Sequence, residues 1–156
     1  MDPFPLISDK STASTDRATL EAIGFGLYCI DVDGRCTYAN QAALAMLGYE
    51  VQDVLGRNMH DLIHHSHPDG SRYPQSACPM LATRQTGRPV RLANEVLWRK
   101  DGSFFTAEYC AWPLWEEGQL AGSVVTLIDT TQQGSARNRL ALQVTVSRML
   151  AGTADL

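Results

Sequence analysis

Three stretches rich in apolar and β-branched residues follow one another between residues 90 and 129. Their sequences are VRLANEVLWRK, SFFTAEYCAWPLW and QLAGSVVTLID. Asp101-Gly102 separates the first two stretches, and Glu117-Gly118 separates the second two. An acidic residue followed by glycine between β-prone runs is typical of a hairpin, because glycine tolerates the positive φ of a tight turn. We therefore predict a three-stranded antiparallel meander, with the earlier part of the chain covering one of its faces.

A helix and a further hairpin are predicted in the first quarter of the chain. Residues 14–23 begin with serine and threonine, which are good N-caps, and are followed by a glycine that ends a helix. The runs GLYCID and CTYAN then flank a glycine-containing turn at residues 32–35, the pattern of a β-hairpin. Residues 1–13, rich in proline, serine and threonine, are predicted to form a flexible leader.

Short helices separated by glycines follow this hairpin. Asn40 is the predicted cap of QAALAML, VQDVL forms one turn ended by Gly56, and a third helix runs from Met59 to about His64. After a proline-rich stretch, in which residues 67–70 (HPDG) fit a type I turn, MLATRQT predicts two further turns of helix. Helices this short are unstable alone, so they need a sheet to pack against.

Composition and charge narrow the class of protein. The chain has 156 residues, 44% of them hydrophobic, and a formal net charge of -4, which favours one globular domain and gives no indication of a nucleic-acid partner. No apolar run approaches the roughly 20 residues of a membrane span. The N-terminus lacks the pattern of a secretory signal, and the four cysteines form no CxxC pair. We predict reduced cysteines and a cytoplasmic location.

The last part of the chain, residues 132–156, has a helical pattern from Ser135 onwards. Leu142, Val146 and Met149 recur at positions i, i+4 and i+7, which gives one narrow apolar stripe. A narrow stripe on a terminal helix is typical of contact with a partner helix. We therefore predict a homodimer that uses this helix.

Several short motifs occur in one order along the chain. They are GLYCIDVDGRCTYAN at residues 26–40, LGY at 47–49, LGRN at 55–58, WRKDGSF at 98–104 and DTT at 129–131. In this order and spacing the motifs resemble those of a PAS domain, the small sensory module of bacterial signalling proteins. The resemblance covers about residues 15–131.

The resemblance implies an α+β fold. Its sheet is expected to have five antiparallel strands in the order 2-1-5-4-3, with short helices on one face and a flanking helix at each end. The predicted division is an N-terminal flanking helix at 14–23, a PAS domain at 24–131 and a C-terminal signalling helix at 132–156. Residues 144–156 are also similar to the first helix of a GAF domain, a second sensory module.

The resemblance also implies where a ligand and a signal are handled. A ligand, where present, is expected between the sheet and the helices. The pocket candidates are Tyr28, Ile30, Leu44, Leu62, His64, Met80, Val96, Trp98, Tyr109 and Val125. Asp129, Thr130 and Thr131 resemble the family's junction between the last strand and the output helix. The output domain expected beyond it is a GAF domain, a histidine kinase or a cyclic-dinucleotide enzyme.

Histidines cluster just before the proline-rich stretch. His60 and His64 are four residues apart, so on a helix they share one face, and His67 and Cys78 are the nearest further ligands for a zinc ion. The alternative is that the histidines hold the loop by hydrogen bonds, with Asp69 and Tyr73 as partners. Both interpretations stay open from the sequence, and the loop-holding role is the favoured one.

Haem and flavin are the two cofactors to consider for this part of the chain. Some PAS domains bind haem through a histidine on the helix before the third strand. That helix contains no histidine here, so His60 or His64 of the preceding helix would have to bind the haem. Light-sensing relatives carry a reactive cysteine after a Gly-Arg-Asn motif, but here Met59 follows that motif, so a flavin adduct is not expected. Redox flavin binding remains open.

Aromatic residues are concentrated on the meander. Strict alternation along a strand places Val96 and Trp98 on the face of Leu92, where they would form a pocket wall. Cross-strand packing or a dimer surface is the alternative explanation for these aromatics, and for Trp112 and Trp115.

No catalytic motif is found in the sequence, so the chain is not predicted to be an enzyme. The expected function is a dimeric sensory module that binds a small ligand or a partner and relays a signal through its flanking helices. The alternatives are a ligand-free dimerisation module and a metal- or haem-binding sensor built on the histidine cluster.

Overall fold

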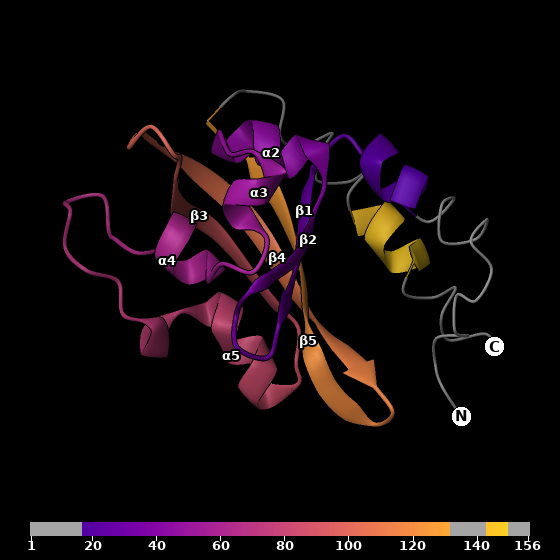
Figure 1. The fold of residues 1–156 in the computed structure, drawn as a ribbon. Coiled ribbons are helices and arrows are strands. Elements are labelled where there is room, and N and C mark those ends of the chain that lie inside the picture. Colours follow the sequence, from indigo (N-terminus) through magenta and orange to yellow (C-terminus); the bar gives the residue numbers. More distant parts are fainter. Residues whose placement is uncertain (1–16, 132–142, 150–156) are drawn as a thin grey trace.

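A five-stranded antiparallel sheet forms the centre of the molecule in the computed structural model, which describes residues 17–131 and 143–149 (Figure 1). The order of its strands is β2-β1-β5-β4-β3. The strands are β1 (Gly26–Asp31), β2 (Cys36–Ala39), β3 (Val90–Trp98), β4 (Phe104–Glu116) and β5 (Gln119–Asp129). The predicted α+β class and strand order are confirmed.

Short helices occupy the chain between β2 and β3 and cover one face of the sheet (Figure 1). They are α2 (Gln41–Leu47), α3 (Val51–Val54), α4 (Met59–Ile63), the 3-10 helix η1 (Gln75–Ala77) and α5 (Pro79–Thr86). Residues 17–22 and 143–149 are also helical, and both lie beyond the opposite side of the strands in Figure 1. None of the described helices is long and apolar enough to cross a membrane.

The predicted hairpin turns form, although by different geometries. Glu117 and Gly118 both have positive φ, 50° and 75°, as a two-residue turn between β4 and β5 requires. Between β3 and β4 only Gly102 has a positive φ, and its N–H donates to the carbonyl of Arg99 at 3.1 Å. That loop is therefore a type I turn followed by glycine.

Asn40 joins three elements near the start of the sheet. Its side-chain oxygen accepts the N–H groups of Leu27 in β1 and Ala43 in α2, each at 2.9 Å. Its amide nitrogen donates to the carbonyls of Leu20, at 3.1 Å, and Phe25, at 3.0 Å. The predicted N-cap of α2 is thus confirmed, and the same side chain also ties the N-terminal helical residues to the domain.

The core lies between the inner face of the sheet and the helices. Tyr28, Tyr109 and Phe105 are its largest fully buried side chains and come from β1 and β4. Val125 and Leu127 of β5 pack beside them and are fully buried. This apolar burial is what stabilises the short helices, none of which exceeds eight residues.

A β-bulge interrupts β3, so the prediction that its side chains alternate strictly between the two faces of the sheet is wrong. Leu92 pairs with Tyr109, but Glu95 rather than Asn94 pairs with Ala107. Asn94 has a φ of 61°, the left-handed conformation that asparagine tolerates in bulges. Residues after the bulge therefore change face.

The change of face corrects the predicted pocket wall. Leu97 pairs with Phe105 and is fully buried in the core, whereas Val96 and Trp98, on either side of it, point to the other face and are only half-buried. Val96 and Trp98 therefore do not share the face of Leu92.

The outer face of the sheet carries the C-terminal helical residues. Val146 is 8% exposed and packs in a small cluster with Ile128, Phe25 and Trp112. At this position the predicted stripe contacts the chain's own sheet, and contact with a partner helix stays a prediction. Met149 is half-buried.

Some predicted segments fall outside the described residues. These are the leader at 1–13, the first three residues of the predicted helix at 14–23, and residues 132–142, which include Leu142. Residues 150–156, which form half of the stretch similar to a GAF domain, lie outside them as well. The GAF resemblance stays a prediction.

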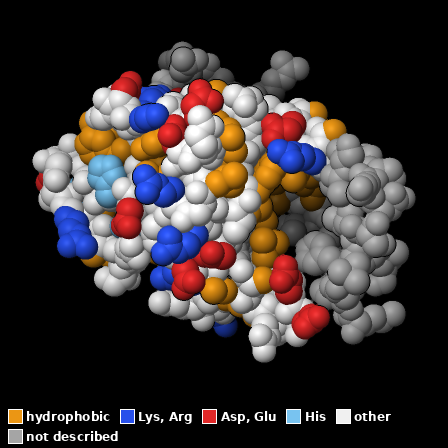
Figure 2. Space-filling model, in the orientation of Figure 1, with side chains coloured by type: hydrophobic (Ala, Val, Ile, Leu, Met, Phe, Trp, Pro, Cys, Tyr) orange, Lys and Arg blue, Asp and Glu red, His pale blue; other side chains and the backbone are white. Residues whose placement is uncertain are grey.

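Charged side chains of both signs are interspersed over the face of the molecule shown in Figure 2. Hydrophobic side chains also reach this surface between them (Figure 2). The large apolar residues that are exposed are Val32, Val51, Leu55, Phe104, Trp115 and Val144. This face therefore does not present a field of a single charge sign.

Candidate functional site

A pocket of about 300 Å³ lies between β3 and the loop that follows α4. Its lining includes His64 and Tyr73 on one side and Asn94, Glu95 and Val96 on the other. The bulge at Asn94 brings Glu95 to the face of Leu92 and Leu97, so its carboxylate points toward the helices. The pocket is thus a direct consequence of the irregular register of β3.

His64 connects this pocket to the interior. Its Nε2 lies 2.9 Å from Oε2 of Glu95, and its Nδ1 lies 3.1 Å from Sγ of Cys78. Burial lowers the pKa of His64, although the Glu95 carboxylate acts in the opposite direction. A neutral imidazole carries one proton, and a carboxylate only accepts, so that proton sits on Nε2. The Nδ1 lone pair therefore faces the Cys78 thiol.

His60 has a similar arrangement one turn earlier on α4. Its Nε2 lies 2.8 Å from the carbonyl oxygen of Tyr73, which can only accept a hydrogen bond. Burial is the main cause that lowers the pKa of His60, so its ring is neutral with the proton on Nε2. Its Nδ1 is buried and has no hydrogen-bond partner among the described residues.

Cys78 is the N-cap of α5 and is 3% exposed. Burial raises the pKa of its thiol, while the backbone N–H groups of Leu81 and Met80 act in the opposite direction. The free thiol is therefore protonated at neutral pH and donates toward Nδ1 of His64.

The predicted loop-holding role of the histidines is confirmed in part. His60 holds the loop through a hydrogen bond to the backbone carbonyl of Tyr73. The ring centroids of His67 and Tyr73 lie 4.6 Å apart. Asp69 is not a hydrogen-bond partner of any histidine, because its carboxylate accepts from the N–H and hydroxyl of Ser71. The predicted turn at residues 67–70 forms, with Gly70 donating to the His67 carbonyl at 2.9 Å.

Most of the predicted pocket residues lie in the packed core instead of around this pocket. Tyr28, Ile30, Leu44, Met80, Tyr109 and Val125 all belong to the main core cluster, and Leu62 packs against it. Within the cluster the Tyr28 hydroxyl donates to Sδ of Met80 at 3.0 Å, and the Tyr109 hydroxyl is buried without a partner among the described residues. Only His64 and Val96 of the ten candidates line the pocket described above.

Trp98 has a structural position at the edge of the sheet. Its indole N–H donates to the carbonyl of Ser66 at 2.8 Å, and its ring stacks on His65 with centroids 5.5 Å apart. It thereby anchors the loop after α4 to β3.

Glu95, Asn94 and Tyr73 also line the pocket, and the sequence did not single out the first two. The asparagine in the middle of a β-prone run is the one sequence signal for a bulge there. Without the bulge, Glu95 would be placed on the other face of the sheet.

The residues that the sequence relates to flavin and haem lie inside the domain. Met59, after the Gly-Arg-Asn motif, is 3% exposed in the core, so no thiol is available there for a flavin adduct. For haem, Nε2 of both His60 and His64 is engaged in a hydrogen bond, and Nδ1 of His64 lies 3.1 Å from Sγ of Cys78. Haem binding by either histidine and redox flavin binding stay predictions.

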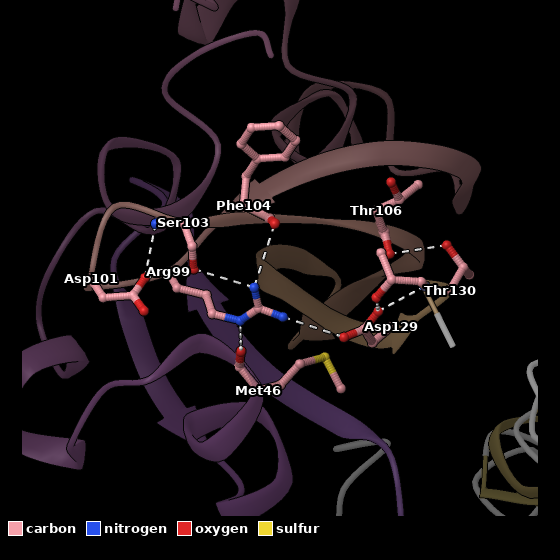
Figure 3. Close-up of polar contacts among 9 residues, drawn as sticks. Met46, Arg99, Asp101, Ser103, Phe104, Thr106, Asp129 and Thr130 are labelled. Carbon is pink, nitrogen blue, oxygen red and sulfur yellow. Dashed lines mark hydrogen bonds and ion pairs between the residues drawn. The ribbon is translucent and has the colours of Figure 1, made fainter. Parts of the chain in front are cut away.

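A second cluster, around Arg99, lies where β5 ends (Figure 3). The Arg99 guanidinium donates to the carbonyl of Met46 in α2 at 3.1 Å and to the carbonyl of Phe104 at 3.4 Å. It also lies 3.5 Å from Oδ2 of Asp129 and 4.5 Å from the ring centroid of Phe105. One side chain therefore contacts a helix, the neighbouring strand and the last residue of β5.

The residues after Asp129 are held by the same end of the sheet (Figure 3). The N–H and hydroxyl of Thr130 donate to the Thr106 carbonyl at 2.9 and 3.0 Å. The N–H of Thr131 donates to the Asp129 carboxylate at 2.9 Å. All three predicted junction residues thus take part in defined polar contacts.

A family model described as PAS fold matches residues 15–130, and the match covers more than half of the chain. The chain belongs to the PAS family. The predicted resemblance is confirmed, and the domain is a sensory and regulatory module like other PAS domains.

Solved structures agree with the PAS fold. The PAS domain of an HTR-like protein from Haloarcula marismortui has a TM-score of 0.59 and 20% identity, with 77% of this chain and 93% of that chain covered. The PAS domain of nitrogen regulation protein NR(II) from Vibrio parahaemolyticus gives 0.58 and 18%, with 73% and 96% covered. A LOV protein of Rhodobacter sphaeroides gives 0.64 and 17%, with 82% and 72% covered.

At these identities the solved structures establish the fold of this PAS domain and nothing finer. Among curated proteins, none matches the chain.

Proposed function

We propose that this PAS domain relays changes in its helical layer to the segment that follows β5, and that Arg99 is the connecting side chain. The observation that supports this proposal is that Arg99 contacts the Met46 carbonyl of α2 and the Asp129 carboxylate at the end of β5. A displacement of α2 would change the position of the guanidinium and, through it, the start of the C-terminal segment.

The strength of the contact suits this role. Arg99 and Asp129 are 29% and 27% exposed, and their closest atoms are 3.5 Å apart. A partly exposed ion pair of this length contributes about 0–1 kcal/mol, because water screens it. A contact this weak can be remade without unfolding the domain, whereas a fully buried pair could not.

The receiving element in this proposal is the C-terminal helix. Val146 packs against Ile128, which immediately precedes Asp129. A shift of Asp129 therefore reaches the helix over one residue. We propose a homodimer formed through Leu142, Val146 and Met149, in which Val146 exchanges its contact with the sheet for contacts with a second copy. We also propose an output domain beyond this helix, in the cytoplasm.

Sedimentation of the Arg99→Gln variant tests the relay. Removing the charge releases both Met46 and Asp129, so the monomer–dimer dissociation constant should change at least threefold. The control is Arg84→Gln, because the Arg84 guanidinium donates to the Val32 carbonyl and not to Met46 or Asp129. An unchanged dissociation constant in Arg99→Gln, with both variants folded, contradicts the proposal.

Truncation before Ser135 tests the dimer itself. Loss of residues 135–156 removes the apolar stripe and should weaken dimerisation at least tenfold. If the truncated chain dimerises as tightly as the full chain, the C-terminal helix is not the dimer element.

A ligand-free interaction module is the second candidate function. The observation that favours it is that six of the ten predicted pocket residues pack in the core cluster. Native mass spectrometry of the purified protein tests this second candidate. A mass equal to that of the bare chain supports the ligand-free module, and a stoichiometric small molecule excludes it.

A further inference from the structure

Three side chains with metal-binding atoms converge at the junction of α4 and α5. His60 lies in the first turn of α4, His64 is the C-cap of the same helix, and Cys78 is the N-cap of α5. One ligand atom from each lies within 4.8 Å of the other two, and all three residues are buried. These positions are fixed by the fold, because α4 and α5 pack on the same sheet.

The hydrogen bonds around the two histidines orient them as metal ligands. Nε2 of His64 donates to Glu95, and Nε2 of His60 donates to the carbonyl of Tyr73. Metal-binding histidines commonly donate their second ring N–H to a carboxylate or a backbone carbonyl in this way. In both rings the nitrogen left with a lone pair is Nδ1.

Those two lone pairs are not equally satisfied without a metal. Nδ1 of His64 accepts from the Cys78 thiol at 3.1 Å. Nδ1 of His60 is buried and unpartnered among the described residues, and His60 is 5% exposed. A purely structural role explains the hydrogen bond of His64. It does not explain why Nδ1 of His60 is buried without a partner, since buried polar atoms are nearly always hydrogen-bonded.

We propose that His60, His64 and Cys78 bind one Zn²⁺ ion. Two imidazole nitrogens and a thiolate suit zinc, whereas calcium and magnesium require oxygen ligands. Binding replaces the S–H bond by a Zn–S bond and releases one proton to solvent. The backbone N–H groups at the start of α5 favour the thiolate that remains.

The geometry requires a small adjustment and leaves one position open. Bond lengths of 2.0–2.3 Å in a tetrahedral site place ligand atoms about 3.5 Å apart, so the side chains must close by about 1 Å. His64 also lines the pocket near Glu95 and Tyr73. Because Nε2 of His64 faces Glu95 in that pocket, a metal bound to Nδ1 lies on the opposite, interior side of the ring. The three side chains leave the fourth position of a tetrahedral site to a water molecule.

This inference goes beyond the proposed relay and does not depend on it. Metal binding concerns the contacts between α4 and α5, whereas the relay concerns α2 and the end of β5. Either can fail while the other holds.

Cobalt titration of the full chain, without a polyhistidine tag, tests the site. Co²⁺ replaces zinc and reports a thiolate ligand by a charge-transfer absorption band. We expect one equivalent of Co²⁺ to give this band together with tetrahedral visible bands, and one equivalent of Zn²⁺ to remove both. Absence of the band in the folded wild-type protein overturns the proposal, whatever the variants do.

Variants assign the ligands. Cys78→Ser should abolish the charge-transfer band, and His60→Gln should weaken Zn²⁺ binding at least tenfold. Glu95→Gln, which keeps the side chain's size but loses the carboxylate behind His64, should weaken it by about 10- to 100-fold.

Matched controls separate these effects from general destabilisation. His65→Ala removes a neighbouring histidine that contacts Ser66 and Trp98, and Cys110→Ser removes a half-buried cysteine on β4. Both controls should bind Zn²⁺ as the wild type does. Equal loss of binding in His65→Ala and His60→Gln would contradict the assigned ligand set.

Discussion

At the scale of single residues, buried polar side chains decide how this small domain is assembled. Asn40, His64 and Glu108 are each less than 5% exposed, although asparagine, histidine and glutamate are usually found at the surface. Each is held by specific partners, and Glu108 accepts from Arg91 at 2.6 Å. Their cost of burial is offset only while those partners remain.

Asn40 gives the clearest stability prediction. Asn40→Ala removes the N-cap of α2 and leaves the N–H of Leu27 and the carbonyls of Leu20 and Phe25 without this partner. We expect a loss of about 2–4 kcal/mol in the free energy of unfolding, measured by urea denaturation. The neighbouring exposed Gln41, changed to alanine, should cost less than about 0.5 kcal/mol. Equal effects of the two changes would show that Asn40 is not a structural hub.

The thiols of β1 and β2 predict how stability depends on pH. Burial raises the pKa of Cys29 to about 12 and that of Cys36 to about 11, well above the value of about 8.5 in an unfolded chain. Above pH 8.5 the unfolded chain loses these protons while the folded chain keeps them. The unfolded state is then favoured, so stability falls as pH rises.

Denaturation between pH 8.5 and 10 measures this effect. Each thiol contributes a decrease of up to about 1.4 kcal/mol per pH unit in the free energy of unfolding. Cys29→Ser should make the decrease of the free energy of unfolding with pH less steep by the contribution of one thiol. A free energy of unfolding that stays constant across this range would contradict burial of the two thiols as protonated groups.

At the scale of elements, hydrophobic patterning and glycines determined most of what could be predicted. The hairpins at Gly34, Gly102 and Gly118 and the helix caps at Asn40 and Gly48 follow from local sequence, and all of them form. Local patterns suffice there because turn and cap geometry depends on a few adjacent residues.

The β3 strand shows where sequence patterning stops. Period-two alternation cannot reveal an extra residue in one strand, because the bulge is defined by the register of the partner strand β4. The error propagated to the candidate site, since it hid Glu95 and misplaced Val96 and Trp98. Likewise, the apolar stripe at Val146 predicted a partner surface but could not say whether that surface was β5 or a second chain.

The bulge itself can be tested by substitution. Asn94 has a φ of 61°, so Asn94→Val should lower the free energy of unfolding by about 1–2 kcal/mol, because β-branched residues disfavour this conformation. Asn94→Gly should be neutral or slightly stabilising at this position. Thermal denaturation compares the two, and a valine variant as stable as the glycine variant would contradict the left-handed conformation.

At the scale of the whole molecule, the sheet separates two sets of elements. Its inner face packs on the helices from α2 to α5, and its outer face carries Val146 of the C-terminal helix (Figure 1). Arg99 is the side chain that contacts both a helix of the inner layer and the end of the strand that leads outward. The histidine cluster lies in the helical layer on the inner face of the sheet. Zinc binding there would therefore change the packing of that layer and not that of the outer face.

Amide hydrogen exchange of residues 143–149 tests the relay most directly. The account predicts that Arg99→Gln raises exchange in this helix at least threefold while exchange in β1 and in the middle of β4 stays as in the wild type, and that Arg84→Gln changes neither. Unchanged exchange of residues 143–149 in a folded Arg99→Gln variant would contradict the relay.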